Sequence, residues 1–120
     1  AQTPAEILAR SVKDLLADTS PKGSLQDIIG RKDAAALGFY VAFFDGLGKA
    51  FFPELGVAFQ LFINSGDWRV IGEAAEVGRQ TARQHAETMT TVFKEGQNRQ
   101  DPQWAAKEIE NRLLCGIIKQ

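Results

Sequence analysis

Histidine and cysteine, the two residues that most often carry nucleophilic or acid–base chemistry, occur once each, as His85 and Cys115. A histidine can act as a general base or a metal ligand, and a thiol as a nucleophile. No second histidine and no HExxH or ExxH spacing surrounds His85. Cys115 lies among Leu and Ile residues, where a thiol is expected to be unreactive. We therefore predict no enzyme activity, no catalytic residue, no metal site and no cofactor, although a Cys–His dyad stays open on sequence alone.

A second candidate lies where Asp45 interrupts the most apolar stretch of the chain. A buried carboxylate is costly unless it is paired, and Lys49, four residues later, could pair with it on a helix. Gly46 and Gly48 between them would also permit a turn. We consider two roles, a surface ion pair and a recognition turn that carries Asp45 and Lys49.

The apolar stretch itself, from Leu37 to Ile63, contains seven of the eight phenylalanines. Large apolar residues lie on most faces of its first half, and a helix of that kind is expected to be buried. Pro53 ends this helix, and a second apolar helix follows. We predict a buried, Phe-rich helical corner over residues 33–63.

The next segment contains neither proline nor a cluster of turn residues, which predicts one long helix over about residues 67–97, with Ser65 or Asp67 as its cap. Its seam of apolar and small residues alternates in steps of three and four, which is typical of a helix packed against others. The seam consists of Trp68, Ile71, Ala75, Gly78, Ala82, His85, Met89, Val92 and Gly96. The small residues at its centre predict that a partner helix approaches closely there.

Helix-capping patterns mark the remaining helices, at Thr3-Pro4, at Ser24 and at Asp101-Pro102. We expect Gly30 to end the helix that Ser24 begins, and Asp33 to cap the next one. No segment alternates with the period of a strand for long enough to build a sheet. The sequence predicts an all-α, single-domain bundle over residues 1–120, with five or six helices.

The composition of the 120 residues limits the classes of function. A hydrophobic share of 44% and a charged share of 24% are ordinary for a soluble globular protein. A net charge of −1 argues against a nucleic-acid binder, and no uncharged run approaches the ~20 residues of a membrane span. The start at Ala1 slightly favours a periplasmic or secreted protein whose signal peptide was removed. Removal of an initiator methionine, or a shortened chain, would leave the same first residue.

The function we expect is that of a non-enzymatic interaction protein, which pairs with itself or with a protein partner through its long helix. A helix of about 45 Å should project beyond a domain whose radius of gyration is about 13–14 Å, and a homodimer would cover the projecting seam. The candidate interface residues are Trp68, Ala82, His85, Met89, Val92 and Trp104. The two tryptophans, each in the first turn of a predicted helix, could instead cover the end of the core.

The alternative comes from a resemblance over about residues 54–118. A short apolar helix, a long helix ending Phe93-Lys94-Glu95-Gly96-Gln97, and a last helix opening Asp101-Pro102 resemble the regulatory half of TetR-type repressors. The resemblance implies a dimer built on the last two helices and an aromatic interior that binds a small apolar ligand. The DNA-reading helix-turn-helix of that family has no counterpart in this sequence.

Overall fold

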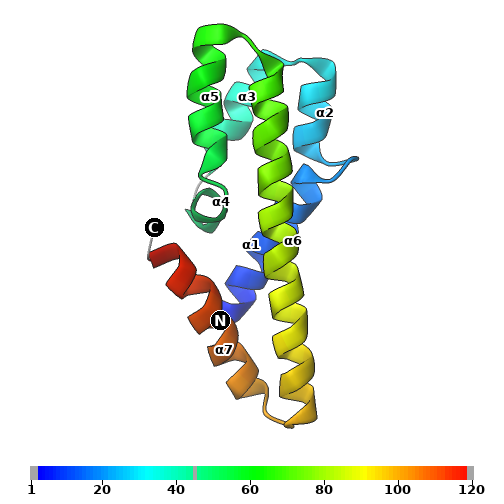
Figure 1. The fold of residues 1–120 in the computed structure, drawn as a ribbon, viewed down its shortest axis with the longest axis vertical. Coiled ribbons are helices and arrows are strands. Elements are labelled where there is room, and N and C mark those ends of the chain that lie inside the picture. Colours follow the sequence, from blue (N-terminus) through cyan, green and yellow to red (C-terminus); the bar gives the residue numbers. More distant parts are fainter. Residues whose placement is uncertain (1–2, 45, 119–120) are drawn as a thin grey trace.

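The computed structural model describes residues 3–44 and 46–118. These residues form seven α-helices and no strand, which confirms the predicted all-α class (Figure 1). The helices are α1 (Pro4–Thr19), α2 (Ser24–Arg31), α3 (Ala34–Phe43), α4 (Gly46–Phe51), α5 (Glu54–Ser65), α6 (Trp68–Asn98) and α7 (Pro102–Ile118).

Helix α6 is the predicted long helix, and it extends along most of an elongated molecule of 52 × 27 × 25 Å. Helices α5, α3 and α2 lie around one half of α6, and α1 and α7 lie along the other half (Figure 1). The radius of gyration is 15.8 Å, above the value we expected for a compact domain. Because α1 and α7 cover the far half of α6, the predicted bare overhang does not exist.

Most helix starts follow the predicted caps. Side-chain oxygens of four residues accept a backbone N–H of the first turn, which satisfies one of the groups left unpaired at a helix N-terminus. These residues are Thr3, Asp33, Asp67 and Asp101. Helix α2 differs from the prediction, because Gly23 precedes it and Lys32, not Gly30, adopts the left-handed conformation at its end.

The predicted helix from Asp33 to Phe52 is interrupted, which accounts for the seventh helix. Helix α3 ends at Phe43, and Phe44 has extended backbone angles. Helix α4 then begins at Gly46, whose φ of +59° is readily adopted only by a residue without a Cβ. The change of direction lets Phe51 and Phe52 at the end of α4 enter the core.

The Phe-rich corner over residues 33–63 is buried only in part. Leu37, Phe51, Phe52, Leu55 and Phe62 belong to the core, as expected. Phe39 and Phe43, in contrast, are 67% and 79% exposed. Helix α3 carries apolar residues on every side but packs mainly on α2 and α5, so its outer side is left uncovered. No helix in the described part of the chain has the length and hydropathy needed to cross a membrane.

Candidate interaction surface

Large apolar side chains remain exposed at several places on the surface. Five of them, on α3 and α5, have exposed fractions of 55% or more: Phe39, Phe43, Val57, Leu61 and Ile63. Single exposed apolar residues are normal, but contiguous apolar patches are uncommon on monomers and mark interaction sites. Two concave areas collect four of these five residues.

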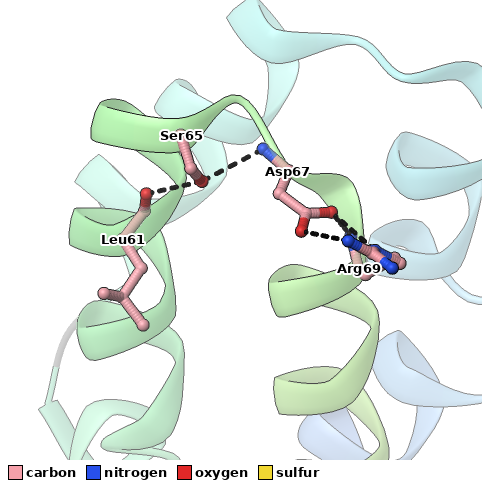
Figure 2. A network of polar contacts seen from close by, with 4 residues as sticks. All are labelled: Leu61, Ser65, Asp67 and Arg69. Atoms are coloured by element: carbon pink, nitrogen blue, oxygen red, sulfur yellow. Dashed lines mark hydrogen bonds and ion pairs between the residues drawn. The ribbon is translucent and has the colours of Figure 1, made fainter.

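The first is organised by the turn between α5 and α6. Gly66 adopts a left-handed conformation with φ +66°, and α6 begins two residues later. Figure 2 shows how side chains hold this turn: the Ser65 hydroxyl donates to the Leu61 carbonyl (2.8 Å) and accepts from the Asp67 N–H (3.2 Å). The Arg69 guanidinium donates to both oxygens of the Asp67 carboxylate, at 3.1 and 3.0 Å. These bonds lower the pKa of Asp67 and fix the first turn of α6, while the Ser65 contacts close the antiparallel hairpin formed by α5 and α6.

A groove of about 400 Å³ runs between the two helices of this hairpin. Its apolar walls are formed by Val57, Ala58 and Leu61 of α5 and by Val70, Ala74 and Val77 of α6. Val57 and Leu61 lie four residues apart, so they present one continuous strip along α5. Apolar side chains exposed on both sides of this groove are a suitable surface for a third helix.

Two glutamates lie in the same groove, Glu54 at the start of α5 and Glu73 on α6. The Oε1 atom of Glu54 is buried and has no hydrogen-bond partner in the structure. No ion pair holds Glu54 or Glu73 within the described ranges 3–44 and 46–118. A buried acceptor without a donor is destabilising, and a cation bound beside this carboxylate would offset part of that cost through its charge.

The second concave area, of about 470 Å³, lies beside α3 and contains the exposed rings of Phe39 and Phe43. Tyr40 lies at its base, where its hydroxyl donates to the Asp18 carboxylate at 2.9 Å. Burial, and then the charge of Asp18, raise the pKa of Tyr40 well above its ordinary value. The Tyr40 ring also stacks on Phe44, with 5.6 Å between centroids. The Tyr40–Asp18 hydrogen bond links α3 to α1.

A third groove, of about 610 Å³, lies where α7 crosses α6 beside the start of α1. Small and apolar residues form most of it, including Ala9, Met89, Phe93 and Ile109. The crossing is close, because a Cβ built on Gly96 would lie 2.6 Å from the Cβ of Ala105. The groove has the size of a small-molecule site.

The structure removes two residues from the predicted interface. Ala82 and Val92 are 0% and 1% exposed, because the seam of α6 faces the protein's own helices. The small centre of the seam also has an intramolecular role, since a Cβ on Gly78 would lie 2.7 Å from the Phe52 ring. The close approach that we expected from a partner helix is therefore made by Phe52.

The two predicted tryptophans are half-buried at helix starts. Trp68 packs on Phe62, with 4.6 Å between ring centroids, and so closes the end of the α5–α6 contact. The guanidinium of Arg99 lies 4.1 Å from the centre of the Trp104 ring, a cation–π contact at the α6–α7 turn. Both tryptophans join neighbouring elements of the same chain.

His85 and Met89 are half-buried on α6. The His85 ring lies 5.0 Å from the ring of Phe51, and burial lowers the pKa of His85. Met89 lines the α1–α6–α7 groove. The structure thus brings His85 next to an apolar ring of the core.

The remaining candidate residues from the sequence are Asp45, Lys49 and Cys115. Lys49 is exposed near the end of α4, while Asp45 lies outside the described residues, as does the side chain of Cys115. In the described part of the chain, no three His, Cys, Asp or Glu residues are grouped so that they could hold a metal ion.

The exposed residues of α3 and α5 were not among the sequence-based candidates. Hydrophobicity alone indicates burial, and the sequence does not show how many neighbours surround a helix. The sequence did contain one indication of an exposed apolar face. Helix α3 is apolar on all sides, and a small domain has few helices with which to cover it. Such a helix needs neighbours on all sides, and the described part of the chain leaves Phe39 and Phe43 uncovered.

Over residues 1–112 the chain matches the family described as "Family of unknown function (DUF6866) C-terminal domain". The match covers most of the chain, so the protein belongs to this family. No curated protein and no solved structure matches the chain.

Proposed function

We propose that this domain is a non-enzymatic protein-interaction module, which pairs with a second copy of itself or with another protein. The observation that supports the proposal is the exposure of the apolar side chains on α3 and α5, above all Phe43 and Phe39. An aromatic side chain that leaves water on binding contributes strongly to affinity, and aromatic residues are enriched at interfaces.

The proposed contact surface differs from the one predicted from sequence. The outer sides of α3 and α5, with the exposed edge of α6, replace the α6 seam, because that seam is used inside the domain. A homodimer remains one form of the proposal, with its contact moved to this surface.

The test compares the parent protein with a surface variant that carries Phe39→Ser, Phe43→Ser, Val57→Ser and Leu61→Ser. Analytical ultracentrifugation measures self-association, and affinity purification of the full chain from its own cells, with quantitative mass spectrometry, measures partner binding. We expect the parent to dimerise or to recover a stoichiometric partner, and the variant to lose that association while its circular dichroism spectrum is unchanged. A monomeric parent whose co-purified proteins are the same as those of the variant would contradict the proposal.

A matched control uses exposed apolar residues elsewhere, Ile7→Ser with Phe93→Ser. These substitutions also remove exposed apolar surface, so a loss of non-specific hydrophobic association would be seen in both variants. Loss of association only with the α3 and α5 substitutions would assign the contact to this surface.

The α1–α6–α7 groove supports a second candidate, the binding of a small apolar ligand. Its volume of about 610 Å³ lies within the range of small-molecule sites. Phe93 is the one aromatic side chain among the described residues that line the groove, so the groove differs from the aromatic interior implied by the TetR-type resemblance. Saturable binding of dodecanoic acid in calorimetry, lost in Ala106→Trp, would support this function; no heat of binding would contradict it.

A further inference from the structure

We propose that the groove between α5 and α6 binds an amphipathic helix of a partner protein, and that this helix carries a lysine or arginine beside its apolar residues. This inference rests on the proposed interaction function and specifies the partner. It uses the α5–α6 groove and does not involve the outer side of α3.

The apolar walls determine the shape of the occupant. Val57 and Leu61 line one side, and Val70 and Val77 line the other. Position 54 to position 61 covers roughly 10 Å of helix at 1.5 Å per residue, about two turns. A docked helix would therefore insert two apolar side chains that are three or four residues apart, the spacing used by helices that bind in grooves.

The charges of the groove determine the sign of the charge that a partner should carry. Its charged lining residues, Glu54 and Glu73, are both acidic. The buried Oε1 of Glu54 has no hydrogen-bond partner, and neither carboxylate forms a close ion pair with another described residue. Arg69, one turn before Glu73, interacts with it only through longer-range electrostatics, so Glu54 is the less compensated of the two. A lysine or arginine that enters the groove would find a carboxylate in a partly desolvated place, where charge pairing discriminates well between partners.

The same charges disfavour a second copy of this chain as the occupant. A two-fold contact places the same patch on both subunits. Glu54 and Glu73 of one copy would then face Glu54 and Glu73 of the other, and like charges at an interface are repulsive. Charge complementarity therefore favours a different protein, with a basic helix.

The first experiment selects binders without assuming a sequence. A displayed library of 16-residue helical peptides, randomised at the apolar and flanking positions, is panned against the folded protein. We expect enriched peptides to combine two apolar residues, three or four apart, with a lysine or arginine. Chemical-shift changes of the ¹⁵N-labelled protein, measured with one enriched peptide, should centre on α5 and the first three turns of α6.

The second experiment tests the contacts with that enriched peptide. Glu54→Gln with Glu73→Gln should weaken binding about tenfold at low salt, and Leu61→Ser should weaken it by at least as much. Two matched controls should bind as the parent does: Glu87→Gln, an exposed glutamate of α6 outside the groove, and Ile63→Ser, an exposed apolar residue of α5 outside the groove. Melting temperatures of all variants verify that each is folded.

Three results would overturn the inference. The selected peptides could lack basic residues, their shift changes could lie outside the groove, or ultracentrifugation could show a dimer that Leu61→Ser dissociates. If association is lost with Phe39→Ser and Phe43→Ser but not with the groove variants, the proposed interaction function holds and this inference fails.

Discussion

The ring of Phe52 occupies the space in which a side chain at position 78 would lie. A Cβ built on Gly78 would lie 2.7 Å from the Cε1 atom of Phe52, closer than non-bonded carbons approach. Phe52 is 1% exposed, so the ring has little room to move away. This contact joins the end of α4 to the middle of α6 and anchors the Phe-rich segment on the long helix.

Gly78→Ala should therefore destabilise the protein by about 1–3 kcal/mol, the usual cost of overpacking a core. Gly72→Ala is the matched control, because it lies in the same helix and a Cβ there meets nothing within 4 Å. Alanine favours a helix over glycine, so Gly72→Ala should be neutral or stabilising by up to about 1 kcal/mol. Urea unfolding followed by circular dichroism measures both, and equal effects of the two substitutions would contradict the close contact.

The phenylalanines of the corner should differ widely in their contribution to stability. Phe52→Ala should lower the free energy of unfolding by about 3–5 kcal/mol, as expected for a fully buried aromatic residue. Phe43→Ala should change it by about 0.5 kcal/mol or less, because its side chain is mostly in water. Thermal melts of the purified variants measure these changes in stability. A large loss of stability for Phe43→Ala would mean that this ring is buried in the free domain.

The bond between Tyr40 and Asp18 should be measurable as a contribution of about 1–2 kcal/mol, since a half-buried hydroxyl donates to a charged acceptor. Tyr40→Phe removes the donor and keeps the ring stacked on Phe44. A double-mutant cycle with Asp18→Asn separates this bond from other effects of either residue. If the two substitutions are additive, the hydroxyl and the carboxylate do not interact in solution.

The pH dependence of stability should contain a contribution from His85. Burial lowers the pKa of His85 in the folded protein below the ordinary value of about 6.5, so the unfolded chain binds the proton more readily. The folded state is therefore fully favoured above about pH 6.5, where His85 is neutral in both states, and the free energy of unfolding decreases as the pH falls through the folded-state pKa. Free energies of unfolding at pH 7.5 and pH 5.5 should differ more for the parent than for His85→Leu; the same difference in both would contradict this assignment.

Local chemistry explains which parts of the fold could be predicted. The starts of α1, α3, α6 and α7 follow from the capping residue that precedes each helix. The length of α6 follows from the absence of proline and of any cluster of turn residues over its 31 residues. The all-α class follows in the same way, from the helical spacing of apolar residues.

The candidate surface required the tertiary structure, because exposure depends on which neighbours a helix has. Phe39 and Phe52 are the same residue type in one apolar stretch, yet one lies in water and the other against Gly78. The interruption at Phe44 and the turn at Gly46 decide that difference by redirecting the chain between α3 and α4.

The sequence by itself determined most of the helices of this protein, since caps and apolar periodicity act over a few residues, but it did not show the break between α3 and α4. Only the tertiary structure decided what each apolar face contacts. The seam of α6 was readable from sequence, but its small central residues receive the protein's own Phe52 in place of a partner helix. The physical reason is that hydrophobic burial has no preferred direction: it drives an apolar side chain out of water but does not specify which surface covers it.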